Sequence, residues 1–295
     1  MATSQASITV CYKTILLATD FLPTTEAALP YVLSLAHSFD ATVLATHAVP
    51  FEAISGLAAV PPNIALDYDW QDGQQAMQKY EKIHPFTGLH HEFLLERGEA
   101  RAVIADVVER RNVDLVVLGT HGRHGFHKLF AGSVAEEIFR SIRCPVLTVG
   151  PAVPPLPDKE WKPRRILFAT EFAEGSVHAL PHALAIADAN DAELLLLHTV
   201  PLVPWEQQSE MAAMYQQHLR KLIPEDTEHR CSIDVAVCFD LAAPGILATA
   251  RDKKSDLIVM GVHHARLPKV DAHLLGTTSY EVVSKAHCPV LTVCG

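Results

Sequence analysis

Three glycines and a serine between two apolar segments are the residues of this chain best suited to chemistry. Gly119 is followed after two residues by Gly122, and after nine more residues by Gly132 and Ser133. Glycines let a ligand approach the backbone closely, and the main-chain amides at a helix start favour negative charge. The spacing therefore predicts a loop that binds an anion such as phosphate.

This loop differs from the two commonest phosphate-binding motifs. It has no Gly-Lys-Ser or Gly-Lys-Thr, and the segment after Asp20 lacks Gly-x-Gly-x-x-Gly. Arg123 and His124 are suited to contact phosphate. His121, His124 and His127 recur every third residue, but no cysteine or carboxylate pattern completes a zinc site. We therefore expect no metal site built from protein ligands.

The segments around the loop alternate between strand and helix patterns. Such alternation is typical of the α/β class, in which a parallel sheet is covered by helices on both faces. The strands expected in the first half are Lys13–Thr19, Thr42–Ala48, His91–Leu95, Asp114–Leu118 and Pro145–Val149. The expected helices are Thr24–Phe39, Asn63–Ile83, Glu99–Arg111 and Gly132–Ser141.

In sheets of this kind, ligands bind beyond the carboxyl ends of the strands, where the strand order reverses. Asp20 follows the first expected strand, and Gly119 follows the fourth. If these two strands are neighbours, Asp20 and the glycine loop face one crevice. Taken alone, Asp20 is more typical of a turn residue or a helix N-cap than of a ligand-binding residue. Its functional interpretation is a carboxylate that accepts hydrogen bonds from ribose hydroxyls or a base.

The chain is a tandem duplication. The segment Ile15–Phe21 recurs 151 residues later as Ile166–Phe172, and Cys144–Val149 recurs 144 residues later as Cys288–Val293. A proline-rich connector, residues 150–163, separates the copies. We therefore expect two domains, residues 1–155 and residues 156–295.

The second copy repeats the fold pattern but not the site. Glu171 stands where Asp20 stands in the first copy, and His264 takes the position of Gly122. A histidine side chain would crowd the close backbone approach that glycine permits. We expect the second copy to bind nucleotide weakly or not at all.

Composition limits the class of function. A hydrophobic fraction of 49% and a charged fraction of 20% are typical of a globular chain. The net charge of -10 argues against broad binding of nucleic acid or anionic membranes. None of the six cysteines forms a Cys-x-x-Cys pair, no secretion signal is recognisable, and no apolar run is long enough to span a bilayer. These features favour reduced thiols in a cytoplasmic protein.

The chain resembles the universal stress protein family in its tandem two-domain form. The resemblance is carried by Ala18–Phe21, by the Gly119-x2-Gly122-x9-Gly132-Ser133 spacing, which matches the ATP-binding subgroup, and by Cys144–Val149. It implies two Rossmann-like, doubly wound parallel sheets of strand order 3-2-1-4-5, paired through their closing strands as a pseudo-dimer. It also allows a homodimer of whole chains.

The same resemblance implies ATP with magnesium in the first domain. The residues it assigns to the nucleotide are Asp20, Ala48, Gly119, Gly122, Arg123, Gly132, Ser133 and Val134. We add Thr19, Thr120 and His124 to the predicted site.

We interpret the sequence as that of a cytoplasmic ATP-binding stress-response protein, in which nucleotide occupancy acts as a regulatory or sensing signal. A slow magnesium-dependent ATPase is the first alternative. Arg123, His124 and Lys128 suit the phosphate charge, but no carboxylate in the loop positions a water molecule. A nucleotide-free interaction module is the second alternative. No catalytic residue is assigned, because no Gly-x-Ser-x-Gly occurs.

Overall fold

The structure is a computed structural model. It describes residues 10–21, 26–50, 62–84, 86–119, 142, 144–156, 160–224, 230–262 and 278–294, with residues 62–69 described by their backbone alone. The chain forms two compact units. Domain 1 comprises Tyr12–Val149 and Pro155–Trp161, and domain 2 is built mainly from Lys162–Gly295 together with Gly150–Pro154.

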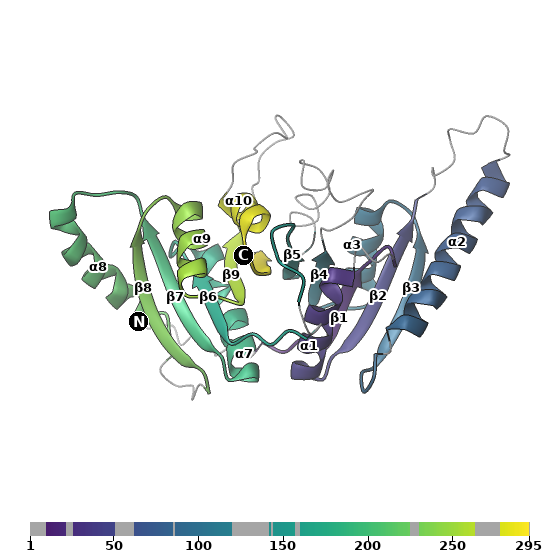
Figure 1. Cartoon of the computed structure of the whole chain (residues 1–295), viewed down its shortest axis with the longest axis horizontal. Coiled ribbons are helices and arrows are strands. Elements are labelled where there is room, and N and C mark those ends of the chain that lie inside the picture. Colours follow the sequence, from purple (N-terminus) through teal and green to yellow (C-terminus); the bar gives the residue numbers. More distant parts are fainter. Residues whose placement is uncertain are drawn as a thin grey trace. The chain divides into compact units, whose positions relative to one another are not determined.

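Domain 1 contains five parallel strands in the order β3-β2-β1-β4-β5 (Figure 1). This order is the one expected for a doubly wound α/β unit. Its described elements are β1 (Thr14–Ala18), the 3-10 turn η1 (Glu26–Ala28), α1 (Leu29–Phe39), β2 (Thr42–Val49), α2 (Pro62–Ile83), β3 (His91–Arg97), α3 (Ala100–Arg110), β4 (Leu115–Gly119) and β5 (Val146–Val149).

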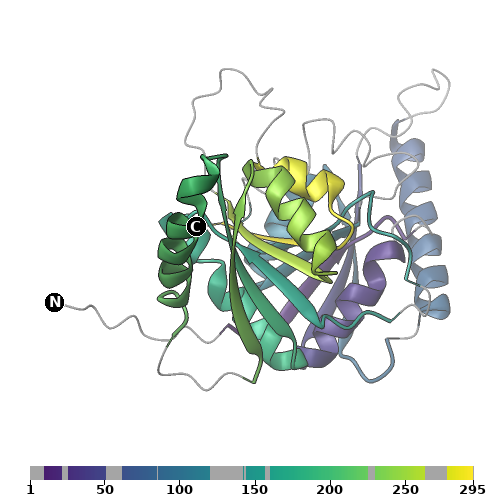
Figure 2. The same ribbon diagram turned by 60° about the vertical axis from the view of Figure 1, so that its left-hand side comes forward.

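Domain 2 repeats this arrangement with the strand order β8-β7-β6-β9-β10. Figure 2 shows α8 on one face of these strands and α9 with α10 on the other. The described elements are β6 (Arg165–Ala169), α6 (Glu174–Val177), α7 (Leu180–Asn190), β7 (Glu193–Val200), α8 (Trp205–Arg220), β8 (Ser232–Phe239), α9 (Ala242–Asp252), β9 (Leu257–Val262), α10 (Thr278–Lys285) and β10 (Val290–Cys294).

The central strands of the domain 1 sheet are buried on both faces, which explains why they are apolar. All five residues of β4 are buried. On one face, Val107 of α3 packs in a cluster with Leu16 and Val116. On the opposite face, Tyr80 of α2 packs near the rings of Phe21 and Phe93. A strand covered on both sides reads as a continuous hydrophobic run, as predicted.

The first long helix of each domain begins and ends in the same way. Pro30 lies in the first turn of α1, where its missing N–H would have no helical partner, and Asp40 ends the helix with φ of 52°. Pro181 and Asp191, whose φ is 49°, do the same for α7. The two prolines thus mark the first turns of equivalent helices.

A carboxylate braces the start of the central strands in both domains. One oxygen of Asp114 accepts hydrogen bonds from the backbone N–H groups of Lys13 at 2.8 Å and Thr14 at 2.9 Å. Asp256 does the same for Arg164 at 3.0 Å and Arg165 at 2.9 Å. The aspartate before β4 or β9 therefore fixes the register of the neighbouring strand.

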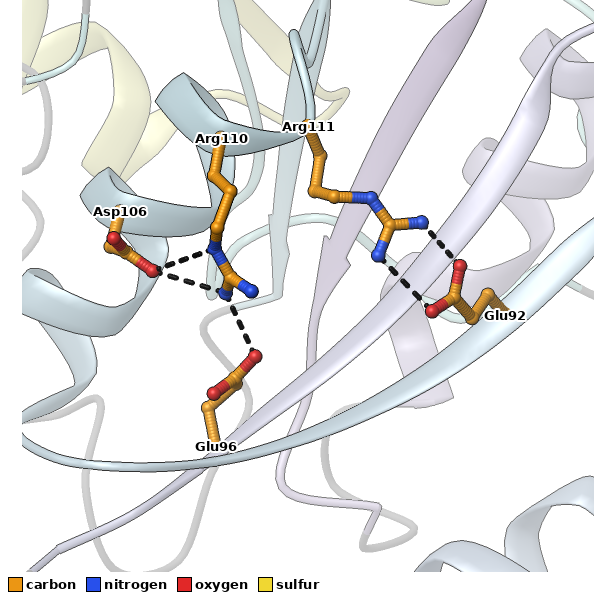
Figure 3. Close-up of polar contacts among 5 residues, drawn as sticks. All are labelled: Glu92, Glu96, Asp106, Arg110 and Arg111. Carbon is orange, nitrogen blue, oxygen red and sulfur yellow. Dashed lines mark hydrogen bonds and ion pairs between the residues drawn. The ribbon is translucent and has the colours of Figure 1, made fainter.

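An exposed ion-pair network joins the end of α3 to β3 (Figure 3). Arg111 makes two hydrogen bonds to Glu92, and Arg110 contacts Glu96 at 2.8 Å and Asp106 at 3.0 Å. Because these groups are solvated, the pairs contribute little to stability.

The remaining differences from prediction are small. The expected strand His91–Leu95 extends to Arg97, and the helix expected from Thr24 begins in the described residues as η1 before α1. The expected helix Gly132–Ser141 lies outside the described residues. Among the described helices, none is long and apolar enough to cross a membrane.

Candidate functional site

The carboxyl ends of β1 and β4 lie side by side. Ala18 at the end of β1 pairs with Leu118 of β4 on one side and with Thr46 of β2 on the other (Figure 1). The strand order reverses here, because the chain runs outward from β1 to β2 and β3 and returns to β4. The structure thus brings Thr19, Asp20 and Gly119 to one edge of the sheet, at the position where doubly wound sheets bind ligands.

A tight turn follows β1. Thr19 is buried, and its Oγ1 accepts a hydrogen bond from the N–H of Phe21 at 2.9 Å. Phe21 has φ of 56°, in the left-handed region that non-glycine residues seldom adopt. The hydrogen bond therefore holds a reversal of the chain in which Asp20 is the central residue.

His47 of β2 stabilises this turn. Its Nδ1 lies 3.0 Å from the carbonyl oxygen of Thr19, and its ring meets the ring of Phe21 edge-on at 5.5 Å. Burial lowers the pKa of His47, and the hydrogen bond to Thr19 and the charge of Asp20 oppose that shift. A carbonyl oxygen only accepts hydrogen bonds, so Nδ1 carries the proton. His47 is therefore a donor fixed on the turn.

Tyr80 of α2 packs against Phe21, which in turn packs against His47. It is 2% exposed, its ring lies 5.4 Å from Phe21, and no described residue bonds its buried hydroxyl. Burial raises the pKa of Tyr80, and Glu26 and Asp20 add to that effect. His84, one turn later, contacts Glu26 at 3.0 Å. The end of α2 is thereby tied to η1, which follows the Asp20 turn.

The face of β2 opposite His47 carries Leu44, Thr46 and Ala48 toward its carboxyl end. Ala48 is half-buried and packs against the cluster that α3 covers. Thr46 is 2% exposed, and its Oγ1 has no hydrogen-bond partner among the described residues. In domain 2 the equivalent residue is Leu197. Among the described residues, domain 1 thus has an unpaired hydroxyl where domain 2 has an apolar side chain.

Most of the predicted glycine loop lies outside the described residues. This applies to the following predicted site residues: Thr120, Gly122, Arg123, His124, Gly132, Ser133 and Val134. His121 and His127 lie outside as well. In the part of the chain that is described, no three His, Cys, Asp or Glu side chains gather into a potential metal site.

Domain 2 contains the same turn. Thr170 Oγ1 accepts from the N–H of Phe172 at 3.0 Å, Phe172 has φ of 65°, and His198 Nδ1 lies 2.8 Å from the Thr170 carbonyl oxygen. Glu171 occupies the central position.

The histidine and the phenylalanine of this turn are absent from the residues predicted for the site. The recurrence of His47 as His198 at the repeat offset of 151 was the signal for them.

Known proteins resemble the chain in both sequence and fold. The profile of the universal stress protein family matches residues 12–150 and 162–293. A universal stress protein of Methanocaldococcus jannaschii is 31% identical over 140 residues, 47% of this chain and 82% of that protein. A universal stress protein A homologue of Coxiella burnetii is 29% identical over 141 residues, 47% of this chain and 96% of that protein.

A solved structure shares the fold over nearly the whole chain. The crystal structure of a universal stress protein from Archaeoglobus fulgidus aligns with 95% of this chain and 96% of its own. The TM-score is 0.67 and the sequence identity is 19%, so this likeness concerns the fold alone.

Proposed function

The chain belongs to the universal stress protein family, and we propose that its domain 1 binds ATP at the carboxyl ends of β1 and β4. Occupancy of this site acts as a regulatory signal in the stress response. Domain 2 binds nucleotide weakly or not at all.

The adjacency of β1 and β4 is the observation that carries the proposal. The register of Ala18 against Leu118 brings the Asp20 turn and the start of the glycine loop to the same edge. A carboxylate on one side and a glycine loop on the other suit a ligand with a hydroxylated sugar and a phosphate chain. In this proposal Asp20 binds the adenosine part, and the loop from Gly119 to Val134 binds the phosphates.

The described residues fit an adenosine at this edge. Ala48 places no large side chain beside the base, and its main chain supplies polar groups. The Thr46 hydroxyl is a buried group of the kind that costs about 1–3 kcal/mol when left unpaired, which suits a polar ligand or an ordered water nearby. Magnesium enters the proposal as the companion of the phosphates, since no described cluster of protein ligands would hold it.

Regulation is proposed to act through the packing of the two halves. β5 and β10 are the last strands of their domains in the orders given above. We propose that they pair, so that the chain is an internal pseudo-dimer, with homodimerisation of whole chains as a further step. A ligand shifts such an equilibrium by its differential affinity for the two arrangements. Hydrogen exchange of the β5 and β10 amides, measured with and without Mg-ATP, tests this. Rapid exchange in both states would contradict the pairing of the two strands. Slow exchange that is the same with and without Mg-ATP would contradict the regulation.

Nucleotide released from purified, denatured protein tests the binding proposal. We expect about one adenine nucleotide per chain, because one of two sites keeps the loop motif. Gly122→Val should abolish it, since a side chain obstructs the approach of phosphate. Asp20→Ala should weaken Mg-ATP binding about tenfold or more, the loss of a charge-assisted hydrogen bond. Glu171→Ala, the matched change in domain 2, should leave binding unchanged.

Each other outcome has a definite meaning. About two nucleotides per chain would show that domain 2 also binds. Turnover of ATP that is lost in Gly122→Val would favour the slow ATPase. No released nucleotide, together with no thermal shift on adding Mg-ATP, would leave the fold standing and refute the proposed function.

A further inference from the structure

The backbone N–H and the backbone carbonyl oxygen of Thr19 both bond to β2, but in different ways. Its N–H donates to the carbonyl oxygen of Thr46 at 3.0 Å, as in a regular ladder. Its carbonyl oxygen accepts from the side chain of His47 at 3.0 Å. In a continued parallel ladder, this carbonyl would accept from the backbone N–H of Ala48. The imidazole therefore replaces a ladder bond where the two strands separate.

The separation falls at the proposed ligand position. Asp20 comes directly after the carbonyl that His47 holds, and Ala48 comes directly after His47. Both residues belong to the proposed adenosine contact. The imidazole is itself held, because Phe21 packs edge-on against it at 5.5 Å and Tyr80 packs against Phe21 at 5.4 Å. A donor with so little freedom fixes the peptide that joins Thr19 to Asp20.

We propose that His47 is a positioning residue for the nucleotide: its Nδ1–H holds the Thr19 carbonyl, and thereby orients Asp20 toward the adenosine. This inference rests on the proposed function of domain 1. His47 itself contacts the turn and not the ligand. Its contribution to binding is the ordering of Asp20 before the ligand arrives, which lowers the entropy lost on association.

Domain 2 supplies the matched control within the same chain. His198 holds the Thr170 carbonyl at 2.8 Å, and Phe172 packs on its ring at 4.6 Å. The central residue of that turn is Glu171, in the domain that is proposed to bind nucleotide weakly or not at all. The same substitution at His47 and at His198 therefore removes the same contact, while only the first lies beside the proposed site.

The test compares variants that keep or remove the donor in the full chain. Asn carries its amide nitrogen on Cγ, as histidine carries Nδ1, so His47→Asn retains a donor at that position. His47→Phe keeps the ring and removes the donor. Mg-ATP affinity is measured by isothermal titration calorimetry, and folding is checked by circular dichroism and thermal melting. If His47→Phe does not fold, His47→Leu replaces it.

We expect His47→Phe to raise the Kd for Mg-ATP about tenfold, His47→Asn to stay within about threefold of wild type, and His198→Phe to leave Kd unchanged. The two Phe variants should lower the melting temperature of their domains to similar extents. Unchanged affinity in His47→Phe, equal losses in Asn and Phe, or an equal loss in His198→Phe would each overturn the inference. A wild-type chain that does not bind Mg-ATP would refute the proposed function first, and the inference with it.

Discussion

Gly261, near the end of β9, lies against the carbonyl group of Gly175 in α6. A Cβ built on Gly261 would come closer than 3.0 Å to the Gly175 oxygen and to the Cα of Ser176. Both obstacles are backbone, so no side chain can move aside. Ser176 is also bonded to Thr170, Oγ to Oγ at 2.9 Å, which ties α6 to the turn after β6. Only glycine allows this helix to rest on this strand.

Gly261→Ala should therefore destabilise domain 2 by about 2 kcal/mol or more, through forced displacement of α6. Urea unfolding followed by circular dichroism measures the effect. Gly245→Ala in α9 is the control, because its Cβ would meet the side chains of Thr199 at 3.1 Å and Cys238 at 3.2 Å. Those groups can shift, and alanine favours helix, so we expect a change within about 1 kcal/mol. Equal losses in the two variants would contradict this explanation.

The stability of domain 2 should fall in acid because of His182 in α7. Burial lowers the pKa of His182 to about 4, from an ordinary value of 6.5. Between these values the unfolded chain binds a proton that the folded chain does not, so stability is full above pH 6.5 and declines as pH falls toward 4. At the lower end the loss is about 3 kcal/mol.

His182→Tyr removes this titrating group and introduces the residue that domain 1 has at the equivalent position, Tyr31, which is 2% exposed. We expect the variant to lose less stability than wild type between about pH 6.5 and pH 4. The measurement is urea unfolding at several pH values. A wild-type chain whose stability is flat over this interval would disprove the prediction.

The first turns of α3 and α9 are capped differently. The side chain of Glu99 accepts hydrogen bonds from the N–H groups of Arg101 and Ala102, both at 3.2 Å. The equivalent Leu241 makes no such bond and is 63% exposed. Leu241→Glu should stabilise domain 2 by about 0.5–1 kcal/mol, by supplying an acceptor and a negative charge at the helix start.

Leu241→Ala is the control that distinguishes the effect of the new cap from the effect of removing an exposed apolar side chain. It provides no acceptor, so its unfolding midpoint in urea should stay near that of wild type. If Leu241→Ala and Leu241→Glu stabilise the domain equally, capping is not the cause. In domain 1, Glu99→Ala should lose about what Leu241→Glu gains in domain 2.

Asp114→Ala should destabilise domain 1 by about 1–3 kcal/mol, because it leaves the N–H groups of Lys13 and Thr14 without their acceptor. Asp114→Asn keeps an acceptor oxygen and should recover most of the loss. Hydrogen exchange at Thr14 reports the same bond locally, and we expect faster exchange in the Ala variant. An Asn variant as unstable as the Ala variant would point to the charge of Asp114 as the important property.

The alternation of apolar runs with helical patterns indicated a parallel α/β sheet, whereas the strand order 3-2-1-4-5 came only from the family resemblance. The end of α1 at Phe39 was predicted correctly, but its start was not, because the helix expected from Thr24 begins at Leu29, after η1. The sequence does not determine that the ends of β1 and β4 are neighbours, and the structure shows that they are.

The turn after β1 could not be derived from local pattern. Phe21 adopts φ of 56° with a local hydrogen bond to Thr19 and with ring contacts to His47 of β2 and Tyr80 of α2, which are distant in sequence. A single histidine in a strand carries no sequence signal that sets it apart from other half-buried residues. Only the duplication distinguishes it, because His47 and His198 keep the same place in both copies. The internal repeat thus substitutes for a comparison among homologues.

The packing of the connector on domain 1 determines what tryptophan fluorescence can report. Trp161 is 7% exposed and its ring lies 5.0 Å from that of Tyr31, while Trp70 lies in α2 beneath the guanidinium of Arg97. The third of the three tryptophans, Trp205, is the only one in domain 2 and is 78% exposed when folded. A red shift of tryptophan emission on denaturation therefore reports the unfolding of domain 1 and the release of its connector. It reports almost nothing of domain 2, because Trp205 is already exposed to solvent. Emission and far-ultraviolet dichroism should coincide only if both halves unfold together.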